Sequence, residues 1–319
     1  MKKDLLEILC CPIHKTELEL IDDEGANGSE ICDGFLICEY GCKYPVIRGI
    51  PRFVSEESYT ESFGFQWRKH SQIYMGNDRQ IAIWELFKRK TGLDGNEIKG
   101  KMFLDVGVGT GGYAKTVISR GGRVIGIDLS LAVESAQENI ANHINCNIIQ
   151  ADLFALPFKR EVFDGIYSIG VLHHTPNCKK AFQGLIPFLK KGGVISIWVY
   201  SVQQGLKIFL SEKLRKITTK MPPKLLYYLC SIAIAYYFIY KIPILGKIIY
   251  KITPPISVEP NWEDRILDTF DWYSATYQSK HTYPEVYRWF KECGLVDIEL
   301  LDVPVGMKGY KPKHSAQRG

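Results

Sequence analysis

Apolar residues between Lys101 and Tyr200 follow a regular alternation of two spacings. Five short apolar runs alternate with segments in which apolar residues recur every three or four positions, as on one face of a helix. The runs are KMFLDV, RVIGID, CNIIQAD, FDGIYSI and GVISIWVY. Because alternating strands and helices are typical of parallel sheets covered by helices, the pattern predicts an α/β fold with helices on both faces of a sheet.

The alternation stops on both sides of this region. Residues 1–54 contain two cysteine-bearing turns, an acidic, glycine-rich loop at Asp22–Glu30 and a strand-like run at Phe35–Cys38, and residues 55–93 predict two helices rich in aromatic side chains. A basic, apolar segment follows the alternation, and a last helix and strand come after it. We therefore predict four parts: a small module at 1–54, a main domain at 55–201, a helical insert or lid at 202–256 and a completion of the main domain at 257–319.

Charge is distributed unevenly along the chain. Lysine and arginine number 40 against 35 aspartate and glutamate residues, an excess too small to indicate a nucleic-acid-binding protein by itself. The segment Val202–Thr253 has a net charge of +8, which leaves the remainder at −3. Its lysines alternate with long apolar runs, whereas phosphate binding is favoured by a polar basic face. The charge pattern therefore argues against a nucleic-acid partner but leaves it as an alternative.

The cysteines favour metal binding over a disulfide framework. Asp4 and Glu7 interrupt the apolar stretch in MKKDLLEILCCP, so it does not form the core of a signal peptide, and we expect a cytoplasmic protein. Five of the nine cysteines fall within the first 42 residues. In a reducing compartment such a cluster is more typical of a metal site.

A glycine-rich turn follows the first strand of the main domain. Residues 105–112 read DVGVGTGG and lead into a helix, and glycines there permit a tight turn and a close approach of the backbone to a cofactor. Gly107, Gly109 and Gly112 also fit the GxGxxG fingerprint of dinucleotide-binding folds. Close packing of the strand on the helix is a third interpretation.

Three aspartates at strand ends help to separate these interpretations. Asp105 lies where dinucleotide-binding folds usually have an apolar residue, and its carboxylate suits the ammonium group of an amino-acid moiety. Asp128 is placed to accept hydrogen bonds from two ribose hydroxyls, as it would also be with NAD. Asp152 can meet an adenine amine while Leu153 and Phe154 flank the ring. Each aspartate could instead cap a helix.

Five motifs of the main domain resemble, in order and spacing, the class I methyltransferases that use S-adenosylmethionine (SAM). The resemblance is specifically to the branch of ubiquinone and menaquinone biosynthetic enzymes. The motifs are LDVGVGTGG, GIDLS, ADLFALPF, FDGIYSIGVLHH and LKKGGVISI. The resemblance implies a Rossmann-like sheet and methyl transfer from SAM. The SAM-binding residues that it implies are Asp105, Gly107, Gly109, Gly111, Asp128, Leu129, Asp152, Leu153 and Ile169. Either Ile169 or Gly170 is expected near the sulfonium.

Histidines after the fourth strand are candidates for a catalytic base. Methyl transfer from a sulfonium requires mainly that the acceptor be positioned in line, and a base is needed only if the acceptor loses a proton. His173 and His174 lie at the sheet edge where ligands bind, so either could accept that proton. Support of the loop is the alternative role for both, and His281 is a weaker candidate.

Cys11, His14, Cys38 and Cys42 form two short pairs with 23 residues between them. Zinc at structural sites favours a closed tetrahedral set of cysteine and histidine ligands. The surrounding sequence resembles the small zinc-ribbon activator proteins of tRNA and rRNA methyltransferases, a module also fused ahead of bacterial methyltransferase domains. His14 replaces the usual cysteine, and the second pair encloses three residues instead of two. A ribbon that has lost its metal is therefore the alternative.

The insert has two interpretations. Leu225–Tyr240 is sixteen residues without a charge, somewhat short of the about 20 apolar residues that a spanning helix needs. It is either a buried lid on the main domain or a lid that lies on the inner face of a membrane, with its lysines near anionic head groups. Trp67, Trp272 and Tyr273 are predicted to wall an acceptor pocket, with core packing as the alternative.

These features predict a SAM-dependent methyltransferase that acts on a small acceptor, hydrophobic or linked to a lipid or glycan. An RNA methyltransferase acting on rRNA or tRNA is the second hypothesis, because the zinc module and the basic insert favour it. A catalytically silent SAM-binding scaffold is the third, and the intact glycine turn argues against it. The sequence indicates neither the acceptor atom nor an oligomeric state.

Overall fold

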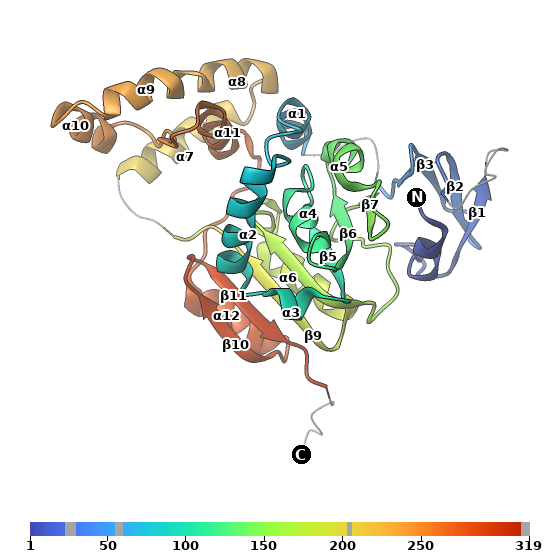
Figure 1. Cartoon of the computed structure of the whole chain (residues 1–319). Helices are drawn as coiled ribbons and strands as arrows, with labels where there is room; N and C mark the ends of the chain where they lie inside the picture. The colour runs from blue at the N-terminus through green and yellow to red at the C-terminus, as the bar shows by residue number, and fades with distance from the viewer. Residues whose placement is uncertain (23–29, 55–59, 203–205, 314–319) are drawn as a thin grey trace.

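The computed structural model describes residues 1–22, 30–54, 60–202 and 206–313, and its largest element is a seven-stranded sheet covered by helices (Figure 1). Its strands are β5 (Met102–Val106), β6 (Arg123–Asp128), β7 (Cys146–Gln150), β8 (Phe163–Ile169), β9 (Leu189–Trp198), β10 (Val296–Leu301) and β11 (Gly306–Tyr310). Their order is β10-β11-β9-β8-β5-β6-β7. The first five strands along the chain pair in parallel, and β11 runs antiparallel to β9 and β10. The predicted Rossmann-like α/β fold is confirmed.

Both faces of the sheet are apolar because helices cover both. Successive side chains of β5 point to opposite faces of the sheet and pack in different apolar clusters. Phe103 packs in one cluster with Val124 of β6, and Leu104 packs in the other with Ile125. All four side chains are fully buried. This explains why the strands appear in the sequence as continuous apolar runs instead of alternating ones.

Seven helices in the described part of the chain belong to the main domain, and side chains cap the N-termini of three of them. The seven are α1 (Glu61–Lys69), α2 (Asn77–Thr91), α3 (Gly95–Ile98), α4 (Gly112–Ile118), α5 (Ala132–Ile140), α6 (Cys178–Leu185) and α12 (Tyr283–Glu292). The side chains of Asp94, Asn177 and Thr282 accept hydrogen bonds from backbone amides in the first turns of α3, α6 and α12. Helices α1 and α2 are the two predicted within residues 55–93.

The N-terminal module is a four-stranded antiparallel sheet that shares its apolar core with the main domain. Its strands are β1 (Leu18–Asp22), β2 (Gly34–Cys38), β3 (Lys43–Ile47) and β4 (Ile50–Pro51), and the 3-10 helix η1 (Lys3–Glu7) precedes them. Leu5 and Leu36 belong to the same buried cluster as Leu104 of β5. The amide of Phe53 donates to the carbonyl of Gln150 at the end of β7 (2.8 Å). The acidic loop predicted at Asp22–Glu30 lies outside the described residues except at its two ends.

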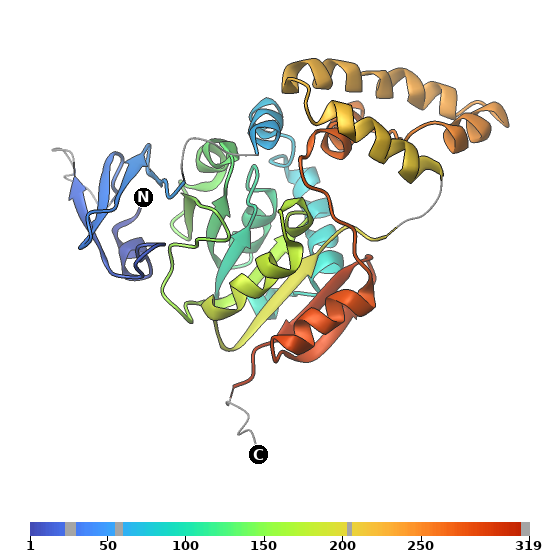
Figure 2. The same cartoon turned by 180° about the vertical axis from the view of Figure 1, so that it is seen from behind.

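The insert forms a separate layer of helices on the side of the molecule away from the N-terminal module (Figures 1 and 2). It consists of α7 (Leu206–Thr218), α8 (Pro223–Cys230), α9 (Ile232–Tyr240) and α10 (Leu245–Ile252). Helices α7, α8 and α9 pack on α11 (Trp262–Ser274), and α10 packs on α7 and α9. The uncharged run Leu225–Tyr240 is broken at Ser231, between α8 and α9. Among the described residues, no helix is both long enough and apolar enough to cross a membrane.

Candidate active site and metal cluster

The glycine-rich turn after β5 has a backbone conformation that other residues would strain. Gly107 has a φ of +84°, and a Cβ added there would lie 2.2 Å from Cγ2 of Val171. Gly111 has a φ of +90°, and its Cβ would lie 2.7 Å from Cδ1 of Ile140. Glycine is therefore required at both positions, at Gly111 for packing against α5.

The carboxylate of Asp128 connects this turn to the loop after β6. One of its oxygens accepts from the Gly109 amide (3.1 Å), and the other accepts from the amide (2.9 Å) and hydroxyl (2.8 Å) of Ser130. Burial raises the pKa of Asp128, and these hydrogen bonds oppose that rise. Asp128 thus fixes the distance between the ends of two neighbouring strands.

A cavity of about 290 Å³ opens where these strands end. Of the residues predicted to bind SAM, those that line it are Gly107, Gly109, Asp128, Leu129, Asp152, Leu153 and Ile169. Asp105 and Gly111 are not among its lining residues. Phe154, predicted to flank the adenine, is 45% exposed and does not line it either. One carboxylate oxygen of Asp152 accepts a hydrogen bond from the Phe154 amide (2.9 Å), and the other oxygen of Asp152 remains available to a ligand.

Asp105 is a buried acid next to the cavity. It is 3% exposed, and its Oδ2 has no hydrogen-bond partner among the described residues. Burial raises the pKa of Asp105 to about 7, interaction with the Tyr167 hydroxyl opposes the rise, and repulsion from Asp128 adds a smaller increase. A buried carboxyl with an unsatisfied oxygen is costly, so this position favours a cationic ligand group nearby.

Two buried polar atoms in the cavity wall also lack partners in the described structure. They are Oγ1 of Thr110 and Oε1 of Gln66, and both residues line the cavity. The indole ring of Trp67 lies next to Gly109, because a Cβ added to Gly109 would be 3.5 Å from that ring. The cavity therefore presents unsatisfied hydrogen-bonding atoms between apolar walls, as a ligand site does.

The two candidate histidines have different surroundings. His174 lines the cavity, and its Nδ1 lies 2.9 Å from the carbonyl oxygen of Tyr277. A carbonyl only accepts, so Nδ1 carries the hydrogen and Nε2 has the free lone pair. Burial lowers the pKa of His174, against the attraction of Asp271, whose carboxylate lies 3.9 Å from Nε2.

His173 lies behind His174 in the protein interior. It is fully buried, does not line the cavity, and accepts a hydrogen bond at Nδ1 from the amide of Tyr200 (3.3 Å). Burial lowers its pKa well below the usual value. His281 is engaged by Glu285 (3.0 Å) and Ser279 (2.8 Å) and does not line the cavity. Of the three histidines, His174 alone faces the space where a ligand fits.

The far wall of the cavity contains polar residues that the sequence analysis did not single out. Asp268 and Asp271 lie one turn apart on α11, and Tyr200 donates from its hydroxyl to Asp271 (2.8 Å). Lys90 of α2 completes this wall, with its ammonium 3.8 Å from the centre of the Trp198 ring. The available signal was the i, i+3 spacing of the two acids in LDTFDWYS, which places both on one helical face.

The aromatic residues predicted to wall an acceptor pocket are divided between two places. Trp67 lines the cavity together with Phe63 and Tyr74. Trp272 and Tyr273 pack instead in the apolar cluster between α8 and α11, and the Tyr273 hydroxyl donates to the carbonyl of Pro255 (2.8 Å). The phase of α11 directs its acids to the cavity and these two aromatic residues away from it.

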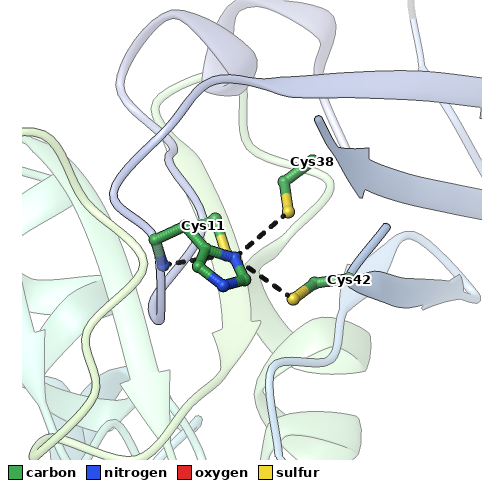
Figure 3. Close-up of side chains that lie close together, drawn as sticks. Cys11, Cys38 and Cys42 are labelled. Carbon is green, nitrogen blue, oxygen red and sulfur yellow. Dashed lines mark hydrogen bonds between the residues drawn. The ribbon is translucent and has the colours of Figure 1, made fainter. Parts of the chain in front are cut away.

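The N-terminal module brings its four predicted ligands together. The thiols of Cys11, Cys38 and Cys42 point toward one centre (Figure 3) and lie 3.7, 3.6 and 3.5 Å from Nδ1 of His14. All four ligand atoms lie within 4.8 Å of one another. A tetrahedral zinc site with ordinary bond lengths has nitrogen-to-sulfur separations of about 3.6 Å. The cluster therefore has the size and composition of a closed structural zinc site.

Comparison with known proteins gives the same picture for the core of the main domain. Residues 104–197 match the family model described as a methyltransferase domain. Phosphoethanolamine N-methyltransferase 2 of Caenorhabditis elegans is 33% identical over 136 residues, 41% of this chain and 29% of that protein. The tRNA (carboxymethyluridine(34)-5-O)-methyltransferase alkbh8 of Xenopus tropicalis is 32% identical over 39% of this chain and 19% of its own length.

A ubiquinone biosynthesis O-methyltransferase of Coxiella burnetii is 27% identical over 35% of this chain and 48% of that protein. The chain thus spans less than half the length of each of these three relatives. Their names differ in the acceptor they give: phosphoethanolamine, a carboxymethyluridine of tRNA, and a compound of ubiquinone biosynthesis. The matches do not single out the ubiquinone branch or fix an acceptor, but residues 104–197, which form most of the central sheet, match a methyltransferase domain.

Proposed function

We propose that the protein transfers a methyl group from SAM to a small acceptor held between the glycine turn and α11. The observation that supports this most directly is the cavity itself. Its one side carries Gly107, Gly109, Asp128 and Asp152 from the methyltransferase domain, and its other side carries polar side chains from α2 and α11. A ligand pocket with two such sides suits a reaction of two bound molecules.

On the SAM side, the residues present fit the molecule. Asp128 has lone pairs left for ribose hydroxyls, and Asp152 has a free oxygen for an adenine amine. The buried acid Asp105, whose Oδ2 has no partner in the described structure, suits an ammonium group. SAM supplies an electrophilic methyl group bonded to a positively charged sulfur. The protein's contribution is to orient the acceptor and to exclude water, because the sulfonium is already a good leaving group.

On the acceptor side, His174 is the best placed base. Its proton on Nδ1 is fixed by Tyr277, its Nε2 is free to accept, and Asp271 lies close enough to stabilise the imidazolium that forms. His173 supports this arrangement from behind through its contact with Tyr200.

The insert would act as a lid over this acceptor side. Tyr227 of α8 hydrogen-bonds His70 (2.7 Å) and packs on Phe65 of α1 and Phe270 of α11. Helices α1 and α11 both contribute residues to the cavity wall, so the insert rests on the roof of the pocket. The RNA alternative would require bases to reach a cavity covered in this way.

We further propose that Cys11, His14, Cys38 and Cys42 bind one structural zinc ion. The support is the match of their separations to a tetrahedron and the contact of the Tyr44 hydroxyl with the Cys11 sulfur (3.3 Å), which supplies an outer hydrogen bond to a metal-bound thiolate. The resemblance to zinc-ribbon activators points the same way. A zinc held by these four ligands has no open position, so it would stabilise the fold and take no part in methyl transfer.

The outer surface of the insert supports contact with an anionic membrane. Large apolar side chains are exposed along α8, α9 and α10: Leu225, Tyr228, Leu229, Ile232, Ile234, Phe238, Ile239, Ile242, Ile244, Leu245, Ile248, Tyr250 and Ile252. Exposed lysines accompany them: Lys224, Lys241, Lys247 and Lys251. Monomeric proteins rarely expose contiguous apolar surface of this extent. The mixture of apolar and basic groups matches a lipid interface with anionic head groups, which would place the protein at the inner face of a membrane.

The SAM assignment predicts a binding defect at Asp128. Replacing it with alanine removes the ribose hydrogen bonds and the bond to Gly109, each worth roughly 1.5–3 kcal/mol when charged. Calorimetric titration should therefore show SAM affinity at least ten-fold weaker in Asp128→Ala, and unchanged in Asp297→Ala, an exposed aspartate at the opposite edge of the sheet. Equal SAM affinity in Asp128→Ala, or tight NAD binding by the wild type, would contradict the assignment.

The base assignment predicts a catalytic defect at His174. In a lysate of the source organism with methyl-labelled SAM, the wild type should label a lipid or small-molecule fraction, and His174→Gln should slow the labelling by about 100-fold while keeping its SAM affinity. Label in RNase-sensitive material would establish the RNA alternative instead. Tight SAM binding without label in any fraction would establish the silent scaffold.

The metal assignment predicts one zinc per chain by elemental analysis. Cys38→Ser should lose the zinc and lower the melting temperature, because metal binding is coupled to folding of the module. Cys32→Ser is the matched control, since Cys32 is an exposed free cysteine of the same module outside the cluster. A wild-type protein that is fully folded and free of metal would exclude the site.

The membrane assignment predicts flotation of the wild type with anionic vesicles, weakened by salt. Ile232→Ser with Phe238→Ser should abolish flotation, because these side chains are 62% and 65% exposed on α9. The control pair is Ile81→Ser with Ile144→Ser, which removes equally exposed isoleucines elsewhere, at 69% and 78%. Wild-type protein that stays at the bottom of the gradient at low salt would leave the insert as a lid alone.

A further inference from the structure

The charges in the wall of the cavity are mostly negative. Four aspartates line it: Asp128, Asp152, Asp268 and Asp271. The first two belong to the side proposed for SAM, and the last two project from α11 on the acceptor side. Lys90 is the one lysine or arginine among the lining residues in the described part of the chain. An anionic group brought into this space would meet an unfavourable field.

The pair on α11 has partners that leave it able to accept further hydrogen bonds. Asp271 accepts from the Tyr200 hydroxyl, and Asp268 accepts from the Ser257 hydroxyl (3.2 Å). Arg215 is near Asp271, but its guanidinium donates to the carbonyls of Trp272 (2.7 Å) and Ala275 (2.6 Å). Both carboxylates therefore keep free acceptor sites on the cavity side.

A third acceptor lies on the helix opposite. Gln66 of α1 is 1% exposed, lines the cavity, and its Oε1 has no partner among the described residues. It lies one turn after Phe63, whose ring is 5.2 Å from that of His174. A buried acceptor oxygen without a partner costs free energy, which a ligand that donates a hydrogen bond would recover.

The positive charge of Lys90 does not offset the negative charge of the aspartates in the cavity wall. Its ammonium lies over the face of Trp198, and burial lowers the pKa of Lys90 to about 8. Burial, together with repulsion from Asp271, raises the pKa of Asp268 to about 7. Burial is the main cause of both shifts, and a positive group bound beside Asp268 would favour its charged carboxylate form.

We propose that the methyl acceptor is an amine, bound as its ammonium ion by Asp268, Asp271 and Gln66 between the aromatic walls of the cavity. This inference rests on the proposed methyl transfer and names its substrate class. Aromatic side chains on the cavity wall suit an ammonium group because their ring faces attract cations. They are Phe63, Trp67, Tyr74, Tyr113, Trp198 and Tyr200.

Residues of the cavity wall can accept the proton that this reaction releases. The ammonium gives one proton to Nε2 of His174, and Asp271 stabilises the imidazolium. The nitrogen lone pair so released forms the new bond to the methyl carbon, the carbon–sulfur bond breaks, and its electron pair stays on sulfur. The products are a methylated ammonium and uncharged S-adenosylhomocysteine.

Binding of matched probes tests the substrate class independently of turnover. The full-length protein saturated with S-adenosylhomocysteine is titrated with 2-phenylethylamine, 2-phenylethanol and phenylacetate, which differ in the charge of one terminal group. The amine should bind at least ten-fold more tightly than the alcohol, and phenylacetate should bind least. Equal or tighter binding of the alcohol or of phenylacetate would overturn the proposal.

Variants assign the effect to the α11 pair. Asp268→Asn and Asp271→Asn should each weaken the amine about ten-fold and leave the affinity for S-adenosylhomocysteine unchanged. Asp264→Asn is the matched control, because Asp264 lies on the same helix, pairs with Arg79 (2.7 Å) and does not line the cavity. Amine affinity unchanged by Asp268→Asn and Asp271→Asn would refute the site. Failure of S-adenosylhomocysteine to bind the wild type would instead refute the methyltransferase proposal, so the two failures are distinguishable.

Discussion

The hydrogen bond from the Gly109 amide to the Asp128 carboxylate holds the cofactor side of the cavity in place. It joins the turn after β5 to the loop after β6, and it exists only because the chain reverses sharply at Gly107. The reversal in turn depends on glycine, since Val171 fills the space where a Cβ would lie. Loss of this hydrogen bond, or a side chain at position 107, would change the separation of two strand ends and with it the shape of the pocket.

The sequence was sufficient for features that depend on neighbours along the chain. The five apolar runs predicted five strands of the sheet, and the spacing of Cys11, His14, Cys38 and Cys42 predicted a cluster that the fold brings together. In each case short-range patterns determine the outcome, because a strand end or a tight turn fixes where its own side chains point. The roles of these residues toward SAM and zinc remain predictions.

Long-range packing determined what the sequence did not reveal. Asp268 and Asp271 face the cavity only because α8 packs on the opposite side of α11 and takes Phe270 and Tyr273 into its core. When a helix carries both acidic and aromatic faces, the face that lies toward a cavity depends on which elements pack against the helix. For the same reason Trp272 and Tyr273 were predicted to wall the pocket, whereas their side of α11 packs against the insert. The antiparallel strand β11 was also missed, because its five residues, GMKGY, contain two glycines and a lysine.

The shared core between the N-terminal module and the main domain bears on how the chain folds during synthesis. Leu9 pairs with Phe158 and Arg52 with Gln150, so the module completes its contacts only when residues 98 to 149 positions later have left the ribosome. At ordinary rates of translation that interval is on the order of ten seconds. Throughout it, Leu5, Leu36 and their neighbours lack the apolar surface that later covers them. The nascent module is therefore a natural client for chaperones, and early closure of its four-ligand cluster would be the local event that limits its exposure.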